Sequence, residues 1–371
     1  MTDFGLFLAG DVMTGRGIDQ VLPHPSAPGL FEPMVTDARV YVDLAARENG
    51  RITAPVSPSY VWGDALAEIE RFHPAVRIAN LETAVTTSAD PWPGKGIHYR
   101  MHPANIACLT AAGIGCYALA NNHVLDWGRA GLVQTLQTLR QAGIAVAGAG
   151  NDLREALAPA VLCLPEQPSN ARVLVFARAT TSSGVPPAWV ATDRRPGLAL
   201  IDHLDEVAAR LLADEIRTHR RDGDRVVLSI HWGGNWGFDI PSQHRDFAHR
   251  LIDLDAVDVV HGHSSHHPLP IEVHRGKLIL YGCGDLINDY EGIETRGALR
   301  SDAACLYFPR LSLSDGTLRR LDIVPVQLRR FSLCAPDLEA RRWLLEVFDR
   351  EGRRFGTRVE EQAGGWRLAW T

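Results

Sequence analysis

The stretch FGLFLAGDVM, residues 4–13, sets the pattern from which the fold of this chain is predicted. Its apolar run is typical of a buried β-strand and is followed at once by an acidic residue, Asp11. Five further apolar runs end on carboxylate, amide or imidazole side chains. They are AVRIAN (75–80), CYALAN (116–121), RVVLSI (225–230), AVDVV (256–260) and KLILYG (277–282). Because open α/β folds bind ligands at strand ends, the six junctions predict a sheet whose strand ends converge on one polar site.

Between residue 4 and about residue 285, short strand-like runs alternate with stretches of helical character. This alternation predicts an α/β fold built from βα units around a largely buried sheet. Long loops are expected at 23–59 and 180–196, which are rich in Pro, Gly, Ser or Thr. An apolar stripe of Val207, Leu211, Leu212 and Ile216 is expected to pack against the core. Helices are expected at 63–72, 103–112, 128–142, 204–221 and 241–254.

The character of the chain changes after about residue 303. A strand-like pair is predicted to form a hairpin that turns at Asp315 and Gly316, and a polar helix is expected at 336–354. The predicted organisation is therefore a catalytic domain at 1–300 and a C-terminal extension at 301–371 that packs on the same domain.

Composition restricts the class of protein. The 371 residues are 46% apolar and 22% charged, which is typical of a soluble globular protein, and the formal charge of -6 argues against a nucleic-acid-binding surface. The six cysteines are scattered without a CxxC pair, so free and mostly buried thiols are expected. No signal peptide or membrane-spanning run is recognised, so the cytoplasm is the expected compartment. The oligomeric state stays open.

Carboxylates follow the first two strand-like runs. Asp11 can bind a metal ion or cap a helix, and Glu82 can bridge two cations, act as a general base or start a capping arrangement. Arg16 can bind an anionic substrate group through its guanidinium, or form a surface ion pair.

The third run ends on Asn121, Asn122 and His123, with Asp126 three residues later. An amide oxygen can bind a hard cation, and a histidine can donate a proton to a leaving group. Asp126 can orient that imidazole, because a carboxylate often holds the second ring nitrogen. A turn carrying a surface histidine is the alternative.

The remaining candidates follow the later strands. His231 precedes a stretch of glycines and tryptophans that suits a tight, dry pocket, and four histidines follow AVDVV. His261 and His263 lie on the same side of an extended backbone and form a natural chelating pair. His263 with His266 is the alternative pair if the loop curls. Cys283 is not expected to act as a nucleophile, and Asp285 is expected to support the histidines or the substrate.

Taken in order, these motifs resemble the CapA family of capsule and poly-gamma-glutamate biosynthesis proteins, which itself resembles a branch of the calcineurin-like metallophosphoesterases. The resemblance covers most of the chain, from about residue 9 to about residue 331. Its motifs are GDVMTGRG, NLET, ANNHVLDWG, HWGGNWG, GHSSHHP, IEVHRGKLILYGCGDLINDYEG and VPVQLRRF.

The resemblance implies a four-layer αββα sandwich with a metal site at the strand ends, holding one or two divalent ions, Mn²⁺ or Zn²⁺. It implies His123 as proton donor, with Asp126 beside it. The phosphoesterase pattern has a histidine where this chain has Met13 and an aspartate where it has Glu82. The implied metal ligands are Asp11, Glu82, Asn122, His231, His261, His263 and His266, and the expected substrate contacts are Arg16, Asn121, Trp232 and Asn235.

Two functions follow as hypotheses. The first is a soluble metal-dependent hydrolase or transferase that acts on a phosphoester or a glutamyl-type amide through a metal-activated water. Its substrate would be a small molecule, a peptide or a polyglutamate-type chain. The alternative is a non-catalytic accessory or binding protein in the biosynthesis of an anionic polymer or a peptide metabolite.

Overall fold

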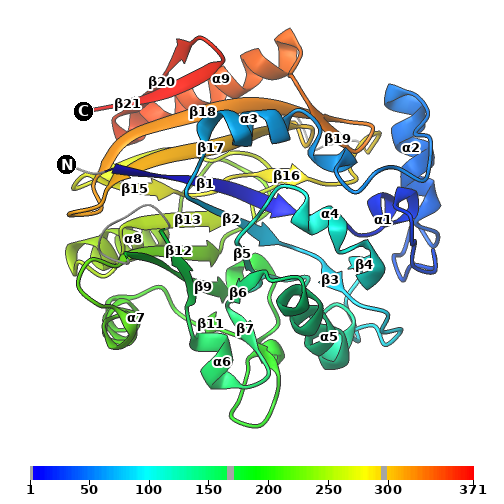
Figure 1. The fold of residues 1–371 in the computed structure, drawn as a ribbon, viewed down its shortest axis with the longest axis horizontal. Helices are drawn as coiled ribbons and strands as arrows, with labels where there is room; N and C mark the ends of the chain where they lie inside the picture. The colour runs from blue at the N-terminus through cyan, green and yellow to red at the C-terminus, as the bar shows by residue number, and fades with distance from the viewer. Residues whose placement is uncertain (1–2, 165–170, 294–298) are drawn as a thin grey trace.

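Two β-sheets pack face to face, and helices cover their outer faces (Figure 1). The computed structural model describes residues 3–164, 171–293 and 299–371. All six apolar runs that the sequence analysis singled out contribute to strands, so the predicted layered α/β fold is confirmed. One expectation is wrong: the six strand ends come from two sheets rather than one.

The first sheet has ten strands within the described residues. Its parallel part contains the first three runs, and β17 pairs antiparallel with β1 on the other side. The order is β20 (Thr357–Gln362), β21 (Gly365–Trp370), β18 (Leu318–Arg329), β17 (Ala303–Ser312), β1 (Asp3–Val12), β2 (Val76–Leu81), β5 (Cys116–Ala118) and β6 (Ala145–Ala147); β16 (Asp285–Ile287) pairs with β1 and β19 (Ser332–Cys334) with β18.

The second sheet has seven strands within the described residues. Its centre is parallel, and the last three apolar runs lie next to each other in it. The order is β11 (Leu200–Ile201), β9 (Arg172–Thr180), β12 (Arg225–His231), β13 (Val259–His263), β15 (Lys277–Leu280) and β14 (Ile271–His274), with β8 (Ala160–Cys163) paired to β9. Two small pairs join β3 (Ala84–Val85) to β4 (Arg100–Met101) and β7 (Ala149–Gly150) to β10 (Gly197–Leu198).

Each of the five expected central helices has a counterpart. They are α3 (Ala65–Phe72), the pair η2 (Pro103–Asn105) and α4 (Ala107–Thr110), α5 (Gly128–Gln141), α7 (Glu206–His219) and α8 (Ser242–Asp253). The expected loop at 23–59 contains a helix, α2 (Arg39–Asn49), whereas 180–196 holds only the short 3-10 turns η3 (Thr181–Ser183) and η4 (Pro187–Trp189). The other helical segments are α1 (Gly17–Val21), η1 (Tyr60–Trp62), α6 (Leu153–Leu157), α9 (Leu338–Gly352) and η5 (Arg353–Phe355).

The core lies between and outside the sheets. One large apolar cluster joins the inner faces of both sheets, for example Leu8 of β1 with Val227 of β12. A second cluster fills the outer face of the second sheet, where α7 and α8 cover it. On the opposite side of the molecule α9 lies over β17 and β18 (Figure 1). The layers therefore run helix, sheet, sheet, helix.

The predicted apolar stripe of α7 is only half correct. Leu212 and Ile216 are buried, but Val207 and Leu211 are 65% and 66% exposed. The helix turns by about 100° per residue, which places 207 and 211 on the face opposite 212 and 216. The inward face is completed by two small residues, Ala209 and Ala213.

The predicted C-terminal hairpin and helix are present. β17 and β18 pair around the turn that contains Asp315 and Gly316, and Gly316 N donates a hydrogen bond to Ser312 O. Because β17 pairs with β1, this segment extends the first sheet. The division of the chain at residue 300 stays a prediction.

Candidate metal centre

Strand register brings the polar strand ends together. In the first sheet Asp11 of β1 lies opposite Asn80 of β2 and Asp285 of β16. In the second sheet His231 of β12 lies opposite His263 of β13. Parallel strands end at the same edge, so each sheet presents its polar residues at one end, and the two ends meet.

Two buried carboxylates form the centre of the site. Asp11 Oδ1 accepts from Asn80 Nδ2 at 2.7 Å, and Asp11 Oδ2 accepts from the Ser264 backbone N–H at 3.2 Å. Glu82 is 2% exposed, and among the described residues its Oε2 has no hydrogen-bond partner. Burial, and then repulsion from Asp285, raises the pKa of Asp11 to about 7. Burial, followed by repulsion from Asp11 and Asp285, raises the pKa of Glu82 well above its usual range.

Histidines of the second sheet face these carboxylates. His231 Nδ1 lies 2.8 Å from His263 Nδ1, and His231 Nε2 lies 3.0 Å from Asn122 Oδ1. Burial lowers the pKa of both imidazoles well below the usual value, so they are neutral and able to bind a metal. One candidate ligand atom from each of Asp11, His231 and His263 lies within 4.8 Å of the others.

A further histidine lies on the Asp285 side. His266 Nδ1 is 2.9 Å from Asp285 Oδ1, and its Nε2 is 2.9 Å from Asn235 Nδ2. Burial opposes the charged imidazole, but Asp285 outweighs it and raises the pKa of His266. Asp285 also accepts a hydrogen bond from Asn288 Nδ2 at 3.1 Å. Asp285 therefore orients His266, as the sequence analysis expected.

The expected proton donor lies on the opposite side of Glu82. His123 Nε2 is 3.7 Å from Glu82 Oε1, and its Nδ1 is 2.7 Å from Asp126 Oδ2. Burial lowers the pKa of His123 to about 4, although the charge of Asp126 opposes this. The ring of Tyr99 meets the imidazole edge-on, with centroids 4.7 Å apart.

The residues fit a divalent cation. Asp285 raises the pKa of both Asp11 and Glu82, Asp11 also raises the pKa of Glu82, and Glu82 Oε2 has no protein partner within the described chain. Buried charges are costly unless they are paired or coordinate a metal. Neutral imidazole, carboxylate and amide oxygen are a donor set that Zn²⁺ and Mn²⁺ accept.

Four residues expected at the site form hydrogen bonds, ion pairs or packing contacts within the protein. His261 directs its ring nitrogens to Ser229 Oγ at 3.1 Å and to the backbone Ala9 O at 2.9 Å, and it lies outside the group formed by Asp11, His231 and His263. Asn121 Oδ1 accepts from the backbone N–H groups of His123 and Val124, and this shapes the turn. Trp232 Nε1 donates to Tyr281 O, and its ring stacks on His244 inside the core.

Arg16 is the fourth. Its guanidinium is buried and donates to both carboxylate oxygens of Asp289 and to Glu32, and it lies over the ring of Tyr41. These protein groups already bind the guanidinium, and the expected substrate contact of Arg16 stays a prediction. The ion pair is also buried rather than at the surface.

Met13 and Lys95 also lie near the site. Met13 is fully buried, and its sulfur lies 3.8 Å from Tyr290 Oη, so position 13 contributes no imidazole. Lys95 contacts both His123 and Asp126, a role that the sequence analysis missed. The one available signal was that Lys95 and Lys277 are the only lysines of the chain.

The thiols are not candidates for catalysis. Within the described residues none of the six cysteines forms a disulfide, and four are buried, whereas Cys163 is exposed and Cys334 is partly exposed. Burial raises the pKa of the Cys283 thiol well above its usual range.

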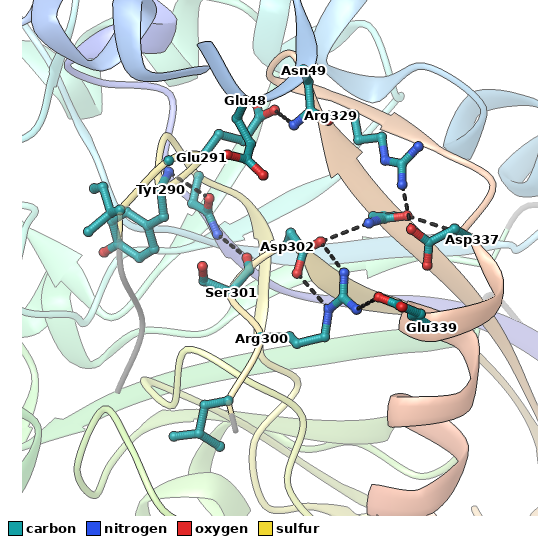
Figure 2. A pocket seen from close by; sticks show the side chains of 15 residues that line it. Glu48, Asn49, Tyr290, Glu291, Arg300, Ser301, Asp302, Arg329, Asp337 and Glu339 are labelled. Carbon is teal, nitrogen blue, oxygen red and sulfur yellow. Dashed lines mark hydrogen bonds and ion pairs between the residues drawn. The ribbon is translucent and has the colours of Figure 1, made fainter. Parts of the chain in front are cut away.

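A pocket of about 520 Å³ (Figure 2) is lined in part by Asn288, which bonds Asp285, and by Tyr290, which contacts Met13. Its two arginines are already paired, Arg300 with Asp302 and Arg329 with Asp337. The lining is acidic overall, so an anionic chain is not expected to enter. Its acidic residues are Glu48, Glu291, Asp302, Asp337 and Glu339.

Fold and site together define a layered α/β protein with a buried candidate metal centre. The family model of the bacterial capsule synthesis protein PGA_cap matches residues 5–290. The chain therefore belongs to this family of capsule synthesis proteins, as the resemblance to CapA indicated. Among the described residues no helix combines the length and the apolar character needed to cross a bilayer.

Individual relatives agree with the family. The chain is 45% identical over 360 residues to a "Probable polyglutamine synthesis accessory protein" of Mycobacterium tuberculosis, covering 95% of this chain and 92% of that protein. It is 24% identical over 320 residues to the "PGA biosynthesis protein CapA" of Bacillus subtilis, covering 86% and 70%. A phosphatase structure from Mycoplasma pneumoniae aligns with a TM-score of 0.48 and 12% identity, covering 93% of this chain and 97% of that one.

Proposed function

We propose that this protein is a metal-dependent hydrolase or transferase. The observation that carries the proposal is Glu82, a buried carboxylate whose Oε2 has no partner in the described structure and whose Oε1 lies 3.7 Å from His123 and 3.9 Å from His231. A buried carboxylate oxygen without a partner is energetically costly, and a bound cation would offset that cost.

Six side chains would hold the metal, as one or two divalent ions such as Mn²⁺ or Zn²⁺. A bound ion would supply an activated water and would stabilise developing negative charge. Asp285 would support the proposed ligand His266 by accepting from its Nδ1, and Nε2, which lies 2.9 Å from Asn235 Nδ2, would exchange that contact for the metal. The proposed ligands are Asp11, Glu82, Asn122, His231, His263 and His266.

His123 would hydrogen-bond the leaving group and pass it a proton. Its Nε2 is the ring nitrogen nearer to Glu82, and Asp126 and Lys95 both lie beside its Nδ1. General acid catalysis of this kind contributes about 10²–10⁴-fold in rate. Asn235 is exposed and bonds His266 Nε2, so we propose it as a substrate contact at the rim.

The substrate class follows from the chemistry and the relatives. Phosphoester and amide hydrolysis both need an activated water and stabilisation of negative charge on the attacked centre. The names of the relatives refer to polyglutamine and PGA synthesis, which supports a glutamyl-type peptide bond as one of the two substrate classes.

A second function is favoured by Met13 and by the word "accessory" in the name of the Mycobacterium tuberculosis relative. With a thioether in place of an imidazole, the centre has fewer strong ligands on the Asp11 side. In this case the site would bind a metal or an anionic metabolite without turnover.

Turnover assays separate the two functions. The purified protein is incubated with a panel of phosphomonoesters, phosphodiesters and gamma-glutamyl peptides, with and without prior removal of metal by a chelator. We expect hydrolysis that is lost after chelation and restored by Mn²⁺ or Zn²⁺. Hydrolysis that survives complete removal of metal would refute the proposal, and metal binding without turnover would support the accessory function.

A further inference from the structure

Lys95 lies in the segment between β3 and β4 and reaches the candidate proton donor. Its ammonium group has three N–H donors. They donate to Ile97 O at 3.1 Å and to Asp126 Oδ1 at 2.5 Å, and Nζ lies 2.9 Å from His123 Nδ1. The side chain is 15% exposed, so solvent reaches it only in part. The contacts with Asp126 and His123 hold this segment against the turn that carries His123.

The two groups next to His123 Nδ1 favour opposite tautomers of the imidazole. Asp126 Oδ2, at 2.7 Å, can only accept, so it favours a proton on Nδ1. The Lys95 ammonium can only donate, so it favours a lone pair on Nδ1 and the proton on Nε2. Asp126 is supplied with donors without the imidazole, because Oδ1 accepts from Lys95 and Oδ2 accepts from the Tyr99 backbone N–H at 2.7 Å.

We propose that Lys95 is a positioning residue that keeps the proton of His123 on Nε2, the nitrogen that faces Glu82 and the metal centre. The inference rests on the proposed function, in which His123 donates that proton. Burial lowers the pKa of the Lys95 ammonium, although the attraction of Asp126 and Glu82 opposes this shift. The ring of Trp189 also lies 5.7 Å from Nζ, measured to its centroid.

The arrangement explains how an uncharged imidazole can act as an acid. As an O–H bond forms on the leaving group, the Nε2–H bond of His123 breaks. A proton from Lys95 forms a new N–H bond at Nδ1, so the ring stays neutral, and the resulting Lys95 amine is reprotonated by water. This proton transfer matters most for leaving groups that need a proton, such as alkoxides and amines, and least for p-nitrophenolate.

The tautomer can be measured without activity. In metal-free protein labelled with ¹⁵N-histidine, long-range ¹⁵N–¹H correlation spectra distinguish Nδ1–H from Nε2–H, and His123→Gln assigns the signal. We expect wild type to carry the proton on Nε2 and Lys95→Met to shift it toward Nδ1. Arg129→Met removes a cation that lies over Trp92 in the same loop region and should change nothing at His123.

The wild-type spectrum alone can overturn the proposal, because a proton found on Nδ1 contradicts it even if Lys95→Met does not fold. An unchanged tautomer in folded Lys95→Met contradicts it as well. In turnover assays Lys95→Met should lose about 10²–10⁴-fold with alkyl phosphates and less than about tenfold with p-nitrophenyl phosphate. A wild-type protein that turns over none of the phosphoesters and gamma-glutamyl peptides of the panel would refute the proposed function and leave the tautomer result standing.

Discussion

Replacing Asp11 with Asn should change how the stability of the metal-free protein depends on pH. Asp11 is fully buried, and its pKa is raised from 3.8 to about 7. Each pKa unit is worth about 1.4 kcal/mol, so a rise of about three units corresponds to roughly 4 kcal/mol. Between these two pKa values the folded state binds more protons than the unfolded state, so Asp11 makes the protein less stable as pH rises from about 4 to about 7.

The measured quantity is the difference between variant and wild type. Buried His231 and His263 have lowered pKa values and add stability over part of the same pH range, but they are present in both proteins. Of the rise of about three units in the pKa of Asp11, roughly two units affect the free energy of unfolding between about pH 5 and pH 8. Asp11→Asn should therefore gain about 3 kcal/mol relative to wild type over that range.

Urea unfolding in the presence of a chelator measures this change. Asp214→Asn, in an exposed ion pair, is the control and should show no such trend. Saturating Mn²⁺ or Zn²⁺ should reverse the order, because a ligand that binds the folded state stabilises it and the variant has lost a ligand. The account would be refuted by a difference in the free energy of unfolding that is independent of pH or that favours wild type at high pH, because a buried Asp11 charge without a cation should destabilise wild type there.

Three other changes test separate parts of the account. His123→Ala should lower kcat by about 10²–10⁴-fold while metal content, measured by elemental analysis, stays at the wild-type level; a parallel loss of metal would make His123 a ligand. Met13→His should tighten divalent-metal binding in calorimetry by about tenfold or more, roughly 1.4 kcal/mol, and unchanged affinity would show that position 13 does not face the ion. Arg16→Ala should lower the free energy of unfolding by about 3–5 kcal/mol, because it leaves Asp289 buried without its partner; an equally stable variant would contradict the buried ion pair.

The sequence allowed the strand ends to be predicted because two regularities coincide. Apolar runs of strand length recur, and polar residues follow each run directly. Parallel pairing then places Asp11 beside Asn80 and His231 beside His263 without further information. For the same reason Glu82, which follows β2 directly, was found.

Roles that depend on a distant partner could not be predicted. The spacing of His261 and His263 is that of a chelating pair, but the His261 nitrogens face Ala9 O and Ser229 Oγ instead of the other candidate ligands. Arg16 gives no local sign that Asp289 lies next to it. In each case the sequence shows the functional group but not the hydrogen bond that already uses it.

Lys95 illustrates the opposite case. It lies 28 residues before His123 in a segment without a recognisable motif, and only the tertiary fold brings Nζ to the imidazole. The alternation of strand-like and helical segments also could not predict two sheets, because βα units have the same sequence pattern whether they join one sheet or two.

Direct measurement of bound metal tests the central claim most closely. The protein is loaded with Mn²⁺ or Zn²⁺, desalted and analysed for metal per chain, together with Glu82→Gln and His261→Gln. The account predicts at least one ion in wild type, loss in Glu82→Gln, and retention in folded His261→Gln, because the His261 imidazole faces Ala9 O and Ser229 Oγ rather than the other candidate ligands. Wild type without a bound ion, or Glu82→Gln that binds as well as wild type, would contradict it.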